Sequence, residues 1–166
     1  MVSVLKTYKR VVGWLNYIVG FTIAILLFAM TVLIFWQVFA RFVMGSPLRF
    51  SEEFARFAMV WLTMLGAAYA YRKGSLISVD LIQEIAGPKL TKVFNIIAFT
   101  LSAAFAGVLV VFGVEMTQNV SGQSGPSTGI SMAWPNLAIP LAGVMILLNS
   151  VALVIDQFID GEGENE

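Results

Sequence analysis

The sequence predicts an all-α integral membrane protein with four transmembrane helices and a short amphipathic interfacial helix between the second and the third. Three observations predict this fold class. The 166 residues are 58% hydrophobic and 12% charged, whereas an average soluble domain is about 25% charged. The mean hydropathy is +0.85. The few charges are gathered into short clusters between long charge-free runs. We expect residues 1–166 to form a single membrane domain.

The composition also excludes several classes of function. Lys and Arg together number 10, as do Asp and Glu, so the formal net charge is zero and nothing favours nucleic-acid binding. The chain has neither cysteine nor histidine. Disulfides, thiolate metal sites, histidine haem ligation and the commonest general base are therefore excluded. We predict no enzyme activity, no catalytic residues, no cofactor and no metal site.

The charge-free runs determine where the spans lie. They are 11–40, 57–71, 93–114 and 116–155. A bilayer core of about 30 Å requires about 20 helical residues, so the first and third runs each hold one span. The fourth run opens with a stretch rich in Gly, Ser and Pro, which is typical of a loop, and leaves one span after it.

The second run has only 15 residues, so its helix has to begin near Ser51 to cross. Glu52, Glu53 and Arg56 then lie at the membrane boundary. The four predicted spans are 14–39, 51–71, 93–114 and 134–155.

The distribution of Lys and Arg predicts that both termini are cytoplasmic. This orientation places seven basic residues in the N-terminus and the second loop, and three in the first loop region. Basic residues are enriched in cytoplasmic loops. The acidic tail, 156–166, contributes little to this rule.

The segment 49–56 is the most informative motif. Glu53 follows Arg49 by four residues, and Glu52 precedes Arg56 by four, so both pairs can meet on a helix. Paired carboxylates could indicate acid–base or cation-coordinating chemistry. Adjacent helical positions point about 100° apart, however, which favours an ion-pair cluster that holds a helix end or a partner subunit.

Between the second and third spans, 78–86 predicts the interfacial helix. Ser78 is a good N-cap, and Gly87 with Pro88 ends the helix. One face is apolar and the other acidic; the residues concerned are Asp80, Leu81, Ile82, Glu84 and Ile85. The segment fits a helix in the cytoplasmic interface or an ordinary loop helix packed on the end of the bundle.

Small residues and mild polar residues within the spans suggest how the helices pack. Spacings of four between small residues allow close backbone approach; they are Gly20/Ala24, Gly66/Ala70, Ala103/Gly107 and Ala138/Ala142. The polar residues are expected to form interhelical hydrogen bonds; they are Thr31, Thr63, Ser102 and Asn149. No predicted span has an ionisable group near its middle, although coupled transport usually requires one. The chain therefore reads as the partner of a transporting subunit.

Several short motifs resemble one known family. They are the acidic pair with arginine in 51–56, then Trp61, the Gly-Ala stretch 65–68, the basic turn 72–74 and the Val-Asp step in 77–80. Together they resemble the small membrane subunit, of the DctQ type, of tripartite ATP-independent periplasmic (TRAP) transporters. The strong part of the resemblance covers about residues 41–85. A histidine that family members often carry before the Val-Asp step is absent here.

The resemblance implies a role in the bacterial inner membrane. The chain would act as a scaffold for a large permease subunit, which carries the substrate and sodium sites, while a periplasmic binding protein delivers an organic acid. Two other classes stay open on the sequence alone. One is a structural membrane anchor of another multisubunit complex, and the other is a small channel or exporter formed by oligomerisation.

Overall fold

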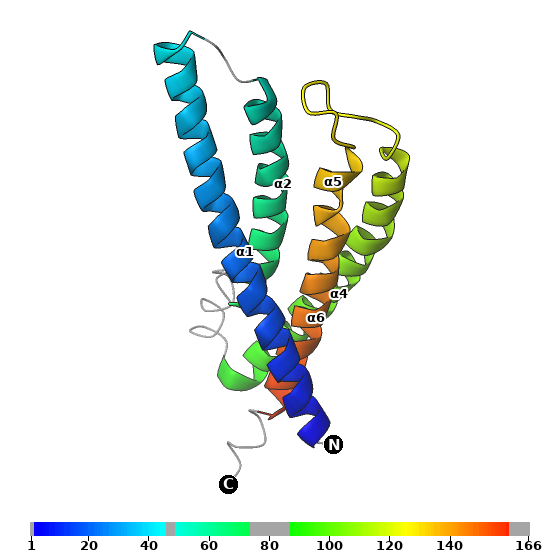
Figure 1. Ribbon diagram of the computed structural model, residues 1–166. Helices are drawn as coiled ribbons and strands as arrows, with labels where there is room; N and C mark the ends of the chain where they lie inside the picture. The colour runs from blue at the N-terminus through cyan, green and yellow to red at the C-terminus, as the bar shows by residue number, and fades with distance from the viewer. Residues whose placement is uncertain (1, 46–48, 74–86, 160–166) are drawn as a thin grey trace.

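The computed structural model describes residues 2–45, 49–73 and 87–159, and these ranges are helical with short connections (Figure 1). The helices are α1 (Val2–Val43), α2 (Arg49–Arg72), α4 (Gly87–Asn119), α5 (Ala133–Asn136) and α6 (Ala138–Ile159). The described residues contain no strand beyond one isolated bridge between Ser124 and Ser131. The all-α prediction is confirmed for this part of the chain.

Three of the described helical segments are long and apolar enough to cross a membrane: Leu5–Val43, Val93–Asn119 and Ala133–Asp156. They contain the first, third and fourth predicted spans. α2 is not among them, because its first turns are charged and its second half is rich in Gly, Ala and Tyr. The predicted interfacial helix, 78–86, lies outside the described residues.

The helices form two pairs that meet along α6. α1 packs against α2, α4 packs against α6, and α2 contacts α6 between the pairs (Figure 1). The Tyr8 hydroxyl donates a 2.9 Å hydrogen bond to the carbonyl of Leu148, so the start of α1 lies beside the second half of α6. We call this the terminal end of the bundle. The opposite end, where α1 ends and α2 begins, is the loop end.

Small residues allow the close helix contacts. A Cβ on Gly20 would lie 2.8 Å from the ring of Tyr69, so α1 and α2 could not approach as they do with a larger residue. A Cβ on Gly143 would lie 2.9 Å from Val110 and 3.1 Å from the carbonyl oxygen of Ala106. Gly66 and Gly107, by contrast, face open space. Of the predicted small residues, Ala138 and Ala142 are buried and Gly20 lies against Tyr69, whereas Ala24 is exposed and the prediction is wrong for Gly66 and Gly107.

A polar junction joins three helices in the interior. The side chains of Asn16 on α1 and Asn149 on α6 exchange hydrogen bonds of 2.6 and 3.1 Å. Asn149 Nδ2 also donates to the carbonyl of Ala68 on α2, at 3.0 Å. Asn149 is fully buried and Asn16 is 6% exposed. Beside them lies a small apolar core of Ala68, Ala142 and Met145.

The break between α5 and α6 has a local cause. Pro140 has no N–H to donate to the carbonyl four residues earlier, that of Asn136, so the helical ladder is interrupted there. Leu137 keeps a helical backbone (φ −58°, ψ −23°) and its N–H donates to Ala133. The two helices therefore continue one another closely, and the last apolar segment runs from Ala133 to Asp156.

α1 presents a wide apolar face outside the bundle. Its exposed side chains recur every three or four residues and are largely aromatic; they include Trp14, Tyr17, Phe21, Phe28, Phe35 and Phe42. Phe42 is 80% exposed and Phe28 is 72% exposed. In water such an exposed apolar surface would promote aggregation. In a membrane, lipid chains or an apolar partner helix can cover it.

Replacing Asn149 with Leu should lower the stability of the bundle. The substitution leaves the buried amide of Asn16 without its partner across the interface. We expect the free energy of unfolding to fall by about 1–2 kcal/mol, measured by denaturation of the purified protein in mixed micelles. The double variant Asn16→Leu/Asn149→Leu should recover part of the loss, because no buried amide is then unpaired.

Thr31→Val is the control for this prediction, since the exposed Thr31 hydroxyl bonds only the carbonyl of Leu27 on its own helix. Its stability should match that of the unmodified protein. An Asn149→Leu variant that unfolds at the same denaturant concentration as Thr31→Val would contradict the prediction.

Candidate functional site

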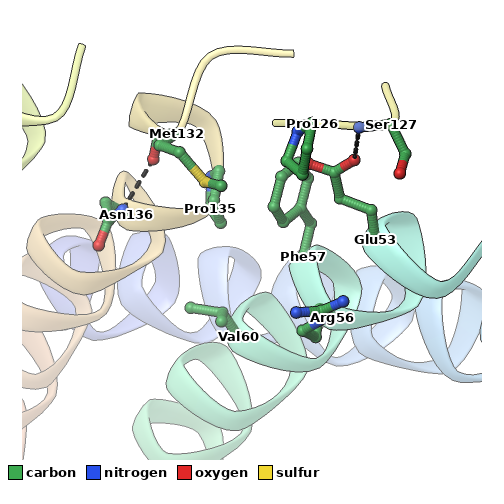
Figure 2. A pocket seen from close by; sticks show the side chains of 9 residues that line it. All are labelled: Glu53, Arg56, Phe57, Val60, Pro126, Ser127, Met132, Pro135 and Asn136. Carbon is green, nitrogen blue, oxygen red and sulfur yellow. Dashed lines mark hydrogen bonds between the residues drawn. The ribbon is translucent and has the colours of Figure 1, made fainter. Parts of the chain in front are cut away.

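The site centres on the carboxylate of Glu53, which lies in the first turns of α2 at the loop end. Glu53 is only 5% exposed. Its Oε2 accepts hydrogen bonds from the backbone N–H groups of Ser127 and Thr128, each 2.9 Å long. Figure 2 shows the side chain reaching from α2 to the segment between α4 and α5. The carboxylate thus joins α2 to a loop more than 70 residues away in the sequence.

The loop is folded so that two consecutive N–H groups face α2. The N–H of Gly125 donates to Ile130, and the N–H of Gly129 donates to Gly125, both at 2.9 Å. Gly129 has φ +67°, which is the left-handed region that favours glycine. We call residues 124–131 the carboxylate loop. Charge-assisted hydrogen bonds from backbone N–H groups are among the stronger kinds, so Glu53 holds this loop on the bundle.

Gly125 is needed for the close approach of the carboxylate loop. A Cβ at this position would overlap Glu53 Oε1 and would lie 2.9 Å from the Thr128 hydroxyl oxygen. Glu53 Oε1 is itself buried and accepts no hydrogen bond from the described residues. The sequence analysis identified this stretch only as a loop. The spacing of Gly, Ser and Thr gave no signal that the loop binds a side chain of α2.

One of the two ion pairs predicted for the segment 49–56 is absent from the described contacts. Glu52 Oε1 accepts a 3.0 Å hydrogen bond from the Gln37 side chain on α1. Among the described residues the ion pairs are those of Lys9 and Arg72 with Asp156, so the predicted pair of Glu52 with Arg56 is not made. The side chain of Arg49, the predicted partner of Glu53, lies outside the described residues, so that pair stays a prediction.

A cleft of about 290 Å³ adjoins Glu53, between α2 and α5 (Figure 2). Phe57 and Val60 of α2 form one wall. Met132 and Pro135 form the other. Arg56 also lines the cleft, and its side chain is exposed. The cleft is therefore mainly apolar with one cation in its lining.

A second cluster of charges lies at the terminal end. Asp156 of α6 forms ion pairs with Lys9 of α1 and, at 3.1 Å, with Arg72 of α2. Nearly two turns earlier on α6, the hydroxyl of Ser150 lies 3.0 Å from that of Tyr71 on α2. The sequence analysis assigned Asp156 only to the acidic tail. Its place two turns after Asn149, on the last apolar segment, was the signal that could have identified it.

The remaining predicted site residues belong to the interfacial helix. Asp80, Leu81, Ile82, Glu84 and Ile85 lie outside the described residues. In the described ranges, no three Asp or Glu side chains gather as a metal ion would need. The described contacts are therefore structural. The Glu53 carboxylate holds the carboxylate loop on α2, and the Asn16–Asn149 junction holds the helices together.

Replacing Gly125 with Ala should release the carboxylate loop from Glu53, because the new methyl group takes the space of Oε1. We expect amide hydrogen exchange at Ser127 and Thr128 to become about ten-fold faster or more, which corresponds to losing a hydrogen bond to a charged group. Glu53→Ala should have the same effect. Exchange measured by mass spectrometry on the protein in detergent tests both variants.

Gly122→Ala is the matched control, since nothing lies within 4 Å of a Cβ at that position in the same loop. Its exchange should be unchanged. Equal exchange in all three variants would show that Glu53 does not hold the loop.

Comparison with known proteins gives a consistent result. Residues 30–160 match the family described as tripartite ATP-independent periplasmic transporters, DctQ component. The chain is 21% identical over 132 residues to the sialic acid TRAP transporter small permease protein SiaQ of Vibrio cholerae, covering 79% of this chain and 76% of that protein. It is 28% identical over 104 residues to the C4-dicarboxylate TRAP transporter small permease protein DctQ of the same species, covering 63% and 45%.

A third relative is much longer. The chain is 26% identical over 147 residues to the sialic acid TRAP transporter permease protein SiaT of Haemophilus influenzae, and the alignment covers 89% of this chain but 23% of that protein. The family match extends over most of the sequence and includes the carboxylate loop, the cleft and Asn149. The chain therefore belongs to the DctQ component family of tripartite ATP-independent periplasmic transporters, a family of transporter membrane subunits rather than enzymes.

Proposed function

We propose that the chain is the small scaffold subunit of a sodium-coupled importer of organic acids in a bacterial inner membrane. It works with a large permease subunit and a periplasmic substrate-binding protein. The names of the relatives support a C4-dicarboxylate, sialic acid or a similar acid as the substrate. The relative SiaT, in which a segment like this chain makes up 23% of a permease protein, supports a close association with a larger subunit.

One observation carries the scaffold role: the two buried asparagines that join α1 and α6 use their side-chain amides on each other and on the backbone of α2. Asn16 and Asn149 satisfy each other and the Ala68 carbonyl. The charged side chains of α1, α2 and α6 lie towards the ends of these helices. Sodium and a carboxylate substrate both need fixed polar partners in a low-dielectric site. We therefore assign those ligands to the large subunit.

We propose that α2 is the fourth span. Its 24 residues correspond to about 36 Å of helix at 1.5 Å per residue, enough to cross a core of about 30 Å. It lies between α1 and α6, both of which are long and apolar. Four crossings bring the start of α1 and the end of α6 to the same side, in agreement with the ion pair between Lys9 and Asp156. We place both termini in the cytoplasm and the 78–86 helix in the cytoplasmic interface.

The charged residues at the loop end are proposed to contribute to assembly. Glu52 is exposed and bonded to Gln37, and Glu53 holds the carboxylate loop. With the exposed Arg56 they form a polar rim beside apolar helix faces, which is a common arrangement at subunit interfaces. We propose that Arg49 contributes to assembly as well. Glu53 contributes to assembly indirectly, because it positions the carboxylate loop, which the large subunit would contact.

The isolated chain should transport nothing. Proteoliposomes that contain only this chain should show no uptake of sialic acid or a C4-dicarboxylate down a sodium gradient, because no ionisable residue lies near the middle of its predicted spans. Co-expression with a large TRAP permease subunit should give a stable complex. Adding that subunit and the binding protein should restore uptake.

Proteoliposomes of the large subunit and binding protein without this chain are the control. Uptake by the isolated chain would overturn the scaffold role. A stable complex with an unrelated membrane enzyme, and none with a permease, would instead favour a structural anchor.

The proposed orientation predicts the activity of reporter fusions. A cytoplasmic fluorescent reporter fused after Glu166 should be active, and periplasmic alkaline phosphatase at the same site should be inactive, because of the seven-to-three bias of basic residues. Fusions after Gly122, in the loop between α4 and α5, should give the reverse result. The same activity at both positions would contradict the four-span arrangement.

A further inference from the structure

We propose that the cleft between α2 and α5 is a binding site for one glycerophospholipid, whose phosphate contacts Arg56 and whose acyl chain lies along Phe57, Val60, Met132 and Pro135. The proposal goes beyond transport and assembly. It uses one element of the proposed function, the crossing of the membrane by α2.

Arg56 is a cation with no anionic partner in the described part of the chain. The acids nearest to it on α2 have other contacts: Glu52 bonds Gln37, and Glu53 bonds Ser127 and Thr128. Arg56 forms none of the ion pairs found among the described residues. A guanidinium presents a planar fork that matches a phosphate group. We assign to this guanidinium an anion from outside the described residues.

The lining of the cleft indicates that the ligand also has an apolar part. Beside Arg56 on α2 lie Phe57 and Val60, and across the cleft lie Met132 and Pro135 (Figure 2). Its volume of about 290 Å³ suits part of an acyl chain and not a whole lipid. No charged residue follows Arg56 on α2 until Arg72. A ligand that is anionic at one end and apolar at the other fits both features.

The depth of the cleft agrees with that of a lipid headgroup. Trp134, beside the cleft on α5, is 62% exposed, and exposed tryptophans concentrate at the level of the headgroups. Arg56 is the innermost charge at the loop end of α2, and arginine extends its charged group to the interface from such positions. The Glu53 carboxylate repels a phosphate, but two N–H groups face its Oε2 and its Oε1 is buried against the carboxylate loop.

The test measures lipids retained by the full chain after purification in mild detergent. Native mass spectrometry should detect one tightly held phosphatidylethanolamine or phosphatidylglycerol. After delipidation, re-addition of dioleoyl phosphatidylglycerol should restore the bound state, whereas dioleoylglycerol, which lacks the phosphate, and inorganic phosphate, which lacks the chains, should not. Arg56→Gln should reduce retention about ten-fold, and Val60→Phe, which fills the cleft, should reduce it as well.

Arg41→Gln is the matched control. Arg41 is an exposed arginine at the loop end of α1 that does not line the cleft, and its loss should leave retention unchanged. Equal retention by Arg56→Gln and the unmodified chain would overturn the proposal, as would equal losses in the two arginine variants. Binding of inorganic phosphate alone would also overturn it.

A further result distinguishes a lipid from a protein partner. If the assembled complex contains no lipid at this cleft and Arg56→Gln lowers only the yield of the complex, a side chain of the partner subunit occupies the site and the proposal is wrong. Because retention is measured on the isolated chain, its outcome does not depend on uptake activity or on the assembly partner. The two proposals can therefore fail separately.

Discussion

The hydrogen bonds around Asn149 are the interaction on which the rest of the bundle depends. In lipid the hydrophobic effect does not drive helices together, so packing and interhelical hydrogen bonds have to do so. A single fully buried amide contacts the side chain of Asn16 and the backbone of α2. It therefore fixes both the rotation of α1 about its axis and the height of α2. The Gly20–Tyr69 contact and the Asp156 ion pairs lie on either side of this junction and follow from the alignment it sets.

Much of the fold was predictable, because a helix that crosses a membrane requires a long run of apolar residues, which is easily found in the sequence. The long charge-free runs contain the cores of α1, α4 and α6. The loop before α5 was marked by Gly, Ser and Pro. α2 was harder to assign, since its charges and small residues lower its hydropathy while its neighbours cover it. When other helices cover a helix, its hydropathy alone does not show whether it lies inside a membrane bundle.

The polar contacts were predicted less well, because their partners are distant in the sequence. Thr31 and Thr63 were expected to bond across helices, but each bonds the carbonyl four residues earlier on its own helix. This is the usual local choice of a threonine hydroxyl in a helix. Asn149 was expected to bond across helices and does. Its amide is longer and both donates and accepts, so it can reach a neighbouring helix. The acids of the segment 49–56 were identified as important. That Glu53 binds the backbone of a distant loop could be known only from the tertiary structure.

The length of α1 has a consequence for the surrounding bilayer. Its charge-free run, 11–40, has 30 residues, or about 45 Å of helix at 1.5 Å per residue. A hydrocarbon core of about 30 Å accommodates only about 39 Å of a helix tilted by 40°, the upper end of the usual range. Even at that tilt, about four residues of the run, or about 6 Å of helix, exceed what lipid of ordinary thickness can cover. This hydrophobic mismatch requires a thickened annulus of lipid or an adjoining protein surface along the Phe-rich face, so that α1 imposes a thickness on its membrane environment.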